Sequence, residues 1–334
     1  MLQHKLLQPQ PTGWQQILAD AIRDPYELLE ILNLPSHLVD LSKTAAEQFP
    51  LRVPRGYAAR MRKQDPNDPL LRQVLPIGAE MQQTKGFNTD PVGDHDAIIK
   101  QGLLQKYHGR VLIMTTAACA IHCRYCFRRH FPYQEQAAKT SLWQTLIDEI
   151  AQDSSISEVI LSGGDPLSLS NPQLLQLMTA LEQTPHLKRL RIHSRYAVVL
   201  PERIDKTLLD WFSQTRLASV MVVHSNHANE IDTSVEIALQ KLKSAGVHLL
   251  NQAVLLKGVN DDIDALCQLS ETLFETGVIP YYLHKLDKVQ GAAHFDMNED
   301  TAKQLIIEMR KRLPGYLVPK LVQEVAGMPY KQPL

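Results

Sequence analysis

The chain has 334 residues, 44% of them hydrophobic, and its 35 Lys and Arg nearly balance its 36 Asp and Glu. A chain of this length can bury a large core, and a formal net charge of −1 gives no indication of a nucleic-acid or anionic-membrane partner. Residues 1–14 contain no apolar stretch of signal-peptide length, and no segment has the roughly 18 apolar residues of a membrane span. We therefore expect a cytoplasmic protein that binds neither nucleic acid nor a membrane.

Residues 1–100 are predicted to form an N-terminal helical segment that wraps around the rest of the chain. Helical apolar spacing covers residues 14–32, and a second short helix is predicted over residues 40–48. Proline and glycine then recur between residues 50 and 96, a pattern that favours loops over an independent domain.

Residues 101–334 alternate six times between an apolar, often β-branched run and an amphipathic helical stretch. The predicted strand and helix pairs are 111–115 with 141–151, 158–161 with 172–181, 189–193 with 204–212, 219–224 with 234–245, 247–256 with 262–276, and 279–283 with 299–312. Such alternation indicates an α/β fold with a parallel sheet. Six pairs rather than eight predict a partial (β/α)6 barrel with strands buried on both faces. Its chemistry is expected at the carboxyl ends of the strands.

Three of the four cysteines lie within eight residues, in the loop after the first predicted strand. Cys119, Cys123 and Cys126 have the spacing C-x3-C-x2-C, which suits metal ligands better than disulfides. Each thiolate can hold one iron of a [4Fe-4S] cluster, which leaves the fourth iron for the amino and carboxylate groups of S-adenosylmethionine (SAM). Cys267 falls in an apolar helical pattern and is predicted to be a buried core residue.

Two other metal sites could use the same cysteines. A zinc site would take His122 or His130 as its fourth ligand, but zinc ligands usually form two pairs separated by a loop. A ferredoxin-like electron carrier would need a fourth cysteine, and Cys267 is far away in the sequence. The radical SAM interpretation is therefore favoured.

Polar residues stand at the ends of the later predicted strands or within them. The second strand ends in a Gly-Gly turn, and paired glycines let a backbone approach a ligand closely. Together with the cysteine motif, this turn is predicted to receive the SAM amino group. The candidate contacts with SAM are Ser162, Gly163, Gly164, Asp165, Ser194, His224 and Gln252.

Several longer stretches resemble lysine 2,3-aminomutase, a family of radical SAM enzymes. They are residues 107–112, 123–129, 195–204, 251–260 and 281–295. The resemblance extends from about residue 14 to residue 331 and is strongest to the short form, which makes β-lysine for the modification of translation elongation factor P. It implies conversion of L-lysine to β-lysine, a reductant protein as electron source, and a functional link to an elongation factor P lysine ligase. It is also compatible with a homo-oligomer.

The same resemblance implies a second cofactor, pyridoxal 5′-phosphate (PLP). Lys331 matches the lysine to which the family attaches PLP covalently, and Tyr107 and Arg110 match contacts to the PLP phosphate. PLP is needed because a bare amino group migrates poorly between carbons. His284 stands where the longer members of the family have a tyrosine near PLP.

The substrate contacts are likewise implied by the resemblance. Arg128 matches the residue that binds the carboxylate of lysine, and a planar guanidinium suits bidentate binding. Asp287 and Glu324 match the two acids that hold the distal ammonium, with glutamate at 324 where the longer enzymes have aspartate.

Two other functions remain open at the level of the sequence. A PLP-dependent radical mutase of another amino acid, such as glutamate, would need a cation in place of Asp287 and Glu324. A non-catalytic adaptor that docks on elongation factor P would need neither the cysteine triad nor Lys331.

Overall fold

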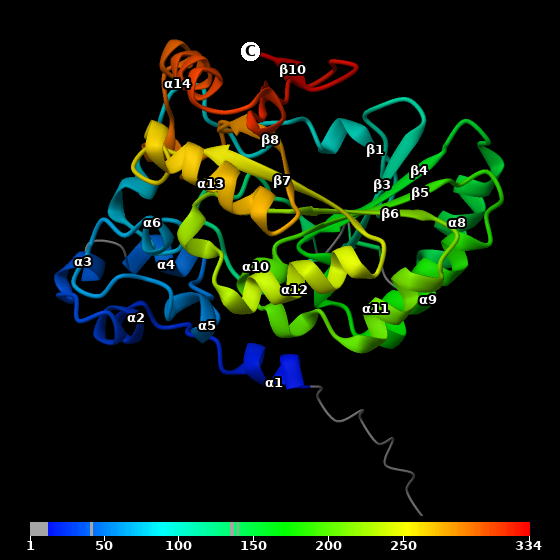
Figure 1. Ribbon diagram of the computed structural model, residues 1–334, viewed down its shortest axis with the longest axis horizontal. Coiled ribbons are helices and arrows are strands. Elements are labelled where there is room, and N and C mark those ends of the chain that lie inside the picture. The colour runs from blue at the N-terminus through cyan, green and yellow to red at the C-terminus, as the bar shows by residue number, and fades with distance from the viewer. Residues whose placement is uncertain (1–12, 41–42, 134–136, 139) are drawn as a thin grey trace, which may run out of the picture.

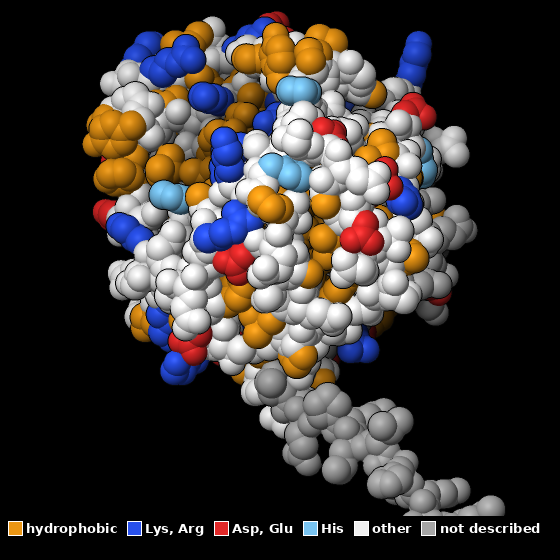
Figure 2. Space-filling model, turned by 90° about the vertical axis from the view of Figure 1, so that its right-hand side faces the viewer, with side chains coloured by type: hydrophobic (Ala, Val, Ile, Leu, Met, Phe, Trp, Pro, Cys, Tyr) orange, Lys and Arg blue, Asp and Glu red, His pale blue; other side chains and the backbone are white. Residues whose placement is uncertain are grey.

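The structure, a computed structural model, describes residues 13–40, 43–133, 137–138 and 140–334. The stretch inspected for a signal peptide lies outside these ranges except for its last two residues. No helix in the described ranges is long and apolar enough to cross a membrane. On the face shown in Figure 2, positive and negative side chains are interspersed, as the balanced composition suggests.

One ten-stranded sheet forms the centre of the molecule, and its strands follow each other in chain order from β1 to β10 (Figure 1). Neighbouring strands from β3 to β9 are parallel, whereas β1, β2 and β10 are added in antiparallel fashion at the two edges. The described sheet is open, which confirms the predicted partial barrel. The strands are β1 (Ile98–Lys100), β2 (Leu103–Leu104), β3 (Arg110–Thr116), β4 (Glu158–Gly163), β5 (Arg189–Ser194), β6 (Ala218–Val223), β7 (His248–Leu255), β8 (Ile279–Lys285), β9 (Lys320–Gln323) and β10 (Gln332–Pro333).

Each of the six predicted strand–helix pairs is confirmed, and the helices line the outside of the curved sheet (Figure 1). Aspartate or asparagine caps begin several of them; Asp232, for example, accepts the N–H of Val235 in the first turn of its helix. Cys267 is buried in its helix, as predicted. The helices are α8 (Trp143–Gln152), α9 (Asn171–Glu182), α10 (Tyr196–Val199), α11 (Lys206–Gln214), α12 (Thr233–Ser244), α13 (Ile263–Glu275) and α14 (Glu299–Arg312).

The strands bury only one face in the core, which corrects the prediction that both faces are buried. On β4, Val159 and Leu161 belong to the main hydrophobic core, whereas the alternate residues Ile160 and Ser162 line a cavity. Side chains alternate between the two faces of a strand, so every second position faces the cavity and can be polar. The strand residues that line the cavity include Arg110, Leu112, Arg191, His193, Gln252, Val254, Tyr282, His284 and Val322.

The N-terminal segment contains two short helices where the sequence predicts one helix over 14–32. α1 (Gly13–Ala19) ends before a break, and α2 (Pro25–Ile31) begins after it with Asp24 as its N-cap and proline at its first position. Asp24 accepts the N–H of Tyr26, and proline cannot continue a preceding helix. The local capping signal therefore overrides the longer apolar periodicity.

The rest of this segment consists of short helices that pack on the sheet. The predicted helix over 40–48 is present in part, although residues 41 and 42 are outside the described ranges. The N-terminal Trp14 and Leu70 belong to the same hydrophobic core cluster as Val159 of the sheet. The short helices are α3 (His37–Asp40), α4 (Lys43–Gln48), α5 (Arg55–Ala58) and α6 (Pro69–Arg72).

A buried carboxylate joins this segment to the loop that carries the cysteines. Glu80 accepts hydrogen bonds from Arg124 Nε at 2.8 Å, from Arg124 Nη2 at 2.6 Å and from Arg129 Nη2 at 2.8 Å. All three side chains are at most 4% exposed. A buried charge that loses its partner is strongly destabilising, so these pairs fix the loop against the N-terminal segment.

We expect Glu80→Gln to lower the free energy of unfolding by about 3–5 kcal/mol, because two buried guanidinium groups would lose their counter-charge. Glu308→Gln is the matched control, since Glu308 pairs with Lys311 on the surface and should change stability by about 0.5 kcal/mol at most. Urea denaturation of both variants measures the difference. Equal stability of the two variants would contradict the anchoring role of Glu80.

Candidate active site

A cavity of about 700 Å³ lies on the inner face of the sheet, and every residue predicted to bind the cluster, SAM, PLP or substrate lines its wall. These residues come from the N-terminal end of β3, from the carboxyl ends of several strands and from the C-terminal hairpin. They are Tyr107, Arg110, Cys119, Cys123, Cys126, Arg128, Ser162, Gly163, Gly164, Asp165, Ser194, His224, Gln252, Asp287, Glu324 and Lys331.

The cavity extends along the inside of the sheet rather than only across its carboxyl edge. Arg110 is the first residue of β3, whereas the cysteine loop follows the last residue, Thr116. At about 3.3 Å per residue, the two ends of this strand are roughly 20 Å apart. Two of the candidate residues, Tyr107 and Arg110, therefore lie at the end of the sheet opposite the cysteine loop, away from the carboxyl ends of the strands.

The cysteine loop presents three thiols to the cavity, and all four cysteines of the described chain are free. Burial raises the pKa of Cys126 to about 11 and the pKa of Cys119 well above its usual range, and the other thiols of the loop add to both shifts. Thiolates are therefore costly here without a cation, and iron would offset that cost. A set of three soft ligands with this chemistry fits an iron–sulfur cluster.

The zinc alternative is not supported by the surroundings of its two candidate histidines. His122 Nδ1 lies 2.8 Å from the carbonyl oxygen of Pro50, and His130 Nε2 lies 3.1 Å from that of Gln290. Within the described residues, no three His, Cys, Asp or Glu side chains converge as ligands of one ion would. A cubane does not require such convergence, since each thiolate binds a different iron.

The Gly-Gly turn after β4 lies against the backbone of the cysteine loop. A Cβ atom on Gly163 would be 2.7 Å from the carbonyl oxygen of Thr116, and one on Gly164 would be 2.5 Å from that of Ala118. Gly163 also has a φ of 122°, which other residues rarely adopt. The amides of Gly164 and Asp165 donate to Thr116 and Ala118 at 2.7 and 2.8 Å. The glycines are therefore required for close contact between two backbones.

Two of the predicted SAM contacts already have partners inside the protein. The Asp165 carboxylate accepts the amides of Leu167 at 3.0 Å and Arg195 at 2.7 Å, and burial raises the pKa of Asp165 to about 6. Ser194 Oγ accepts the amide of Tyr196 at 3.0 Å. Both side chains thus stabilise the conformation of the turn. The amino group of SAM would then bind acceptor atoms of the turn such as backbone carbonyl oxygens.

We expect Gly164→Ala to displace the cysteine loop, because the added methyl would overlap backbone atoms that cannot move independently. Iron bound after anaerobic reconstitution should fall severalfold, and the thermal unfolding midpoint should drop. Gly56→Ala is the control: nothing lies within 4 Å of its Cβ position, so iron binding should be unchanged. Normal iron content in Gly164→Ala would refute the close-contact argument.

A chain of alternating charges crosses another part of the cavity wall. Lys331 Nζ donates to Glu324, and Lys106 Nζ donates to Glu324 Oε1 at 2.8 Å and lies 2.7 Å from Asp94 Oδ1. Asp94 Oδ2 in turn accepts from Arg128 Nε at 2.6 Å. The chain thus connects the predicted PLP lysine to the predicted carboxylate-binding arginine.

The C-terminal hairpin brings the first of these pairs together. β10 pairs with β9 so that Gln332 is opposite Gln323, and the next residues across the hairpin are Lys331 and Glu324. Lys106 and Asp94 are candidates that the sequence patterns do not indicate. The one sequence signal for Lys106 is that it directly precedes residues 107–112, a stretch that resembles the family.

Glu324 and Asp94, the two acids in this row of ion pairs, have much lower pKa values than Asp287 has. Burial raises the pKa of Glu324 and Asp94, but the neighbouring cations outweigh it and bring both pKa values to about 2. Burial, helped by the charge of Glu324, raises the pKa of Asp287 to about 7. Asp287 Oδ1 is buried and has no hydrogen-bond partner among the described residues. Asp287 is therefore the acid that is still available to a cationic ligand.

Three histidines on the cavity wall also have a buried nitrogen without a partner. His284 is buried, whereas His193 and His224 are half-buried, and each of the three has a buried Nε2 atom for which the described chain supplies no partner. Burial lowers the pKa of all three, that of His224 to about 4, so the imidazoles are neutral at pH 7. Buried polar atoms are normally satisfied, and these atoms indicate a polar ligand in the cavity.

The residues near Lys331 fit a phosphate-bearing cofactor such as PLP. The guanidinium of Arg110 lies over the Tyr107 ring, 4.7 Å from its centre. This cation and the orphaned histidine nitrogens can bind a phosphate and a polar ring. Lys331 supplies a primary amine on the same cavity wall.

Comparisons with known proteins identify similar chains over most of this length. Residues 108–225 match the family described as a 4Fe-4S single cluster domain. The chain is 48% identical over 327 residues to the L-lysine 2,3-aminomutase of Escherichia coli (strain K12), a match that covers 98% of this chain and 95% of that one. It is 49% identical to the protein of the same name from Haemophilus influenzae, with 96% and 94% covered.

More distant matches carry the same name or a related title. The L-lysine 2,3-aminomutase of Clostridium subterminale is 31% identical, over 96% of this chain and 77% of its own length. Among solved structures, a radical SAM methyltransferase from Sphaerobacter thermophilus matches with a TM-score of 0.45 and 13% identity, over 66% of this chain and 68% of that chain.

Proposed function

The chain belongs to the L-lysine 2,3-aminomutase family of radical SAM enzymes, and we propose that it converts L-lysine to β-lysine by moving the amino group from carbon 2 to carbon 3. The observation that carries this proposal is the single cavity wall that includes both the cysteine triad and Lys331. An aminomutase of this kind needs a radical source and a carrier for the migrating nitrogen in one chamber.

Three cofactors follow from this assignment. When bound, the [4Fe-4S] cluster with SAM supplies a carbon radical, and PLP supplies an aldehyde that holds the migrating nitrogen. Cys119, Cys123 and Cys126 hold the iron, and Lys331 holds PLP covalently. Ser162, Gly163, Gly164, Asp165, Ser194, His224 and Gln252 surround SAM. Tyr107 and Arg110 contact the PLP phosphate.

The two ends of lysine are bound by groups of opposite charge. Arg128 is held by Asp94 through Nε and donates to Ser162 Oγ at 3.1 Å through Nη1, so its orientation is set before a carboxylate arrives. Asp287 has an unpartnered oxygen for the distal ammonium. Glu324 is already paired with Lys106 and Lys331, and we therefore assign the ammonium to Asp287 first, with Glu324 as a neighbouring charge.

The biological setting is proposed from the resemblance to the short form of the family. β-Lysine would serve the modification of translation elongation factor P through its lysine ligase, and a low-potential protein would supply the electron for the cluster. The free cysteines suit a reducing compartment, which supports a cytoplasmic location.

Anaerobic incubation of the reconstituted protein with L-lysine, SAM, PLP and a reductant tests the proposal. We expect chiral product analysis to detect β-lysine, and Lys331→Ala to abolish its formation while iron content stays at the level of the unaltered protein. Borohydride reduction and mass spectrometry should identify PLP on Lys331. A parallel incubation with L-glutamate should give no product. Formation of β-glutamate instead would favour the other mutase, and absence of iron or PLP would favour the adaptor.

The pKa of Asp287 sets a pH dependence for substrate binding. An ammonium binds the ionised carboxylate, so lysine affinity should rise from about pH 6 to about pH 8, as Asp287 loses its proton near pH 7, and then level off. Asp287→Asn should weaken lysine binding roughly ten- to a hundredfold and remove this dependence. Calorimetric titrations of the PLP-loaded protein without SAM give both quantities. An unchanged pH profile in Asp287→Asn would assign the ammonium to another group.

A further inference from the structure

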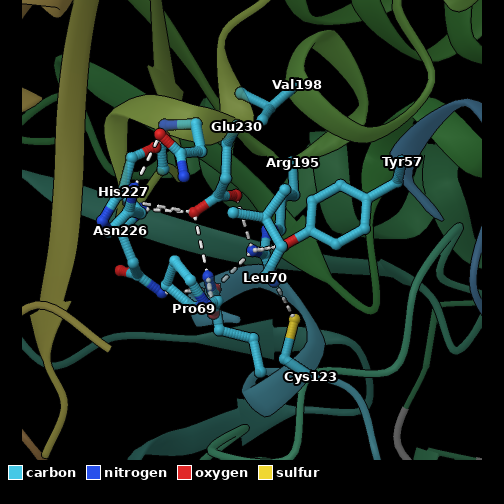
Figure 3. Close-up of polar contacts among 12 residues, drawn as sticks. Tyr57, Pro69, Leu70, Cys123, Arg195, Val198, Asn226, His227 and Glu230 are labelled. Carbon is cyan, nitrogen blue, oxygen red and sulfur yellow. Dashed lines mark hydrogen bonds and ion pairs between the residues drawn. The ribbon is translucent and has the colours of Figure 1, made fainter. Parts of the chain in front are cut away.

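Arg195 contacts one of the three cysteines directly. It follows β5, and its Nη1 atom donates to Cys123 Sγ at 2.7 Å. Its backbone amide donates to Asp165 of the glycine turn at 2.7 Å, which fixes the position from which the side chain extends. Figure 3 shows Arg195 between the sulfur of Cys123 and the carboxylate of Glu230.

The Nη2 atom of the guanidinium has three partners from distant segments, whereas its Nε atom has no hydrogen-bond partner among the described residues. Arg195 Nη2 donates to Glu230 Oε2 at 2.7 Å, to Gln73 Oε1 at 2.6 Å and to Tyr57 Oη at 3.2 Å. Arg195 is 6% exposed and Glu230 is 0% exposed. Glu230 is itself held by the amides of Asn226 and His227 at 2.8 and 3.1 Å (Figure 3).

Burying this ion pair costs desolvation free energy, and a contribution to stability does not by itself account for the presence of the pair. Burying an arginine–glutamate pair removes two charges from water, and a well-packed apolar pair is often at least as stable. Here the pair is oriented, because the positive end contacts the sulfur and the negative end lies behind it. An oriented buried pair produces a fixed electric field at Cys123.

We propose that Arg195, oriented by Glu230, raises the reduction potential of the cluster bound through Cys123 and is a positioning residue for the electron-uptake step. This inference rests on the iron–sulfur cluster of the proposed function. In that step one electron from a low-potential donor protein is added, and no bond is made or broken. The added electron increases the negative charge on the cysteine sulfurs. A hydrogen bond from a cationic donor stabilises that charge and favours the reduced state.

Redox titration followed by electron paramagnetic resonance, on reconstituted protein without SAM, tests the proposal. Arg195→Gln should lower the midpoint potential by at least the equivalent of a tenfold change in the reduction equilibrium, about 59 mV for one electron. Glu230→Gln should shift the potential in the opposite direction, because the guanidinium stays and its counter-charge is lost. Arg195→Lys keeps the charge and should restore a large part of the shift.

The double variant Arg195→Gln/Glu230→Gln covers the case in which an unpaired Glu230 prevents folding. It removes the oriented pair and should still lower the potential, by less than Arg195→Gln does. Arg203→Gln is the matched control. Arg203 is fully buried, but its Nε donates to the carbonyl oxygen of Leu167 and not to a sulfur, so the potential should stay within a twofold change of the equilibrium.

Equal potentials in Arg195→Gln and the unaltered protein, at equal iron content, would overturn the inference and leave the proposed function intact. A weaker affinity for SAM with an unchanged potential would also overturn it, and would make Arg195 a ligand of SAM instead. An unaltered protein that binds no iron would overturn both this inference and the proposed function.

Discussion

The loop that carries the cysteines has no helix or strand between residues 117 and 130, and it has few internal hydrogen bonds, so its shape depends on contacts from other segments. The Gly-Gly turn holds its first part through backbone hydrogen bonds, Glu80 holds its arginines from the N-terminal side, and Arg195 reaches Cys123 from β5. Three thiols can bind one cluster only if their spacing is maintained. The close packing of these segments around the loop therefore maintains the spacing of the three thiols.

Buried charge is the second feature that organises the cavity. The network from Lys331 through Glu324, Lys106 and Asp94 to Arg128 alternates in sign, so each charge has a neighbour of opposite charge. Asp287 is outside this network, and burial keeps part of its population protonated at neutral pH. In the proposed function, the distal ammonium of lysine would supply the cation that Asp287 lacks.

The strand–helix alternation is readable in the sequence because each unit repeats a local periodicity of burial. The prediction is less complete at the edges of the sheet. β2 and β10 have two residues each, which is too short for a periodicity, and β9 has four. In the N-terminal segment, the Asp24 cap divides one apolar stretch into two helices. The sequence also does not reveal that one face of the strands lines a cavity. Alternation separates the residues into two faces, but it does not say which face is packed against other side chains.

The sequence by itself determined the cysteine spacing, the Gly-Gly turn and the order of the strand–helix units, since each is a pattern within a few neighbouring residues or a repeat along the chain. The family resemblance added Lys331 and the substrate residues. Only the tertiary structure decided that Lys106 lies between Glu324 and Asp94, and that Arg195 connects Cys123 with Glu230. The partners in these contacts come from distant segments, since Lys106 and Glu324 are 218 positions apart in the sequence. A buried charge is paired by whatever the fold places beside it, and no local pattern records that partner.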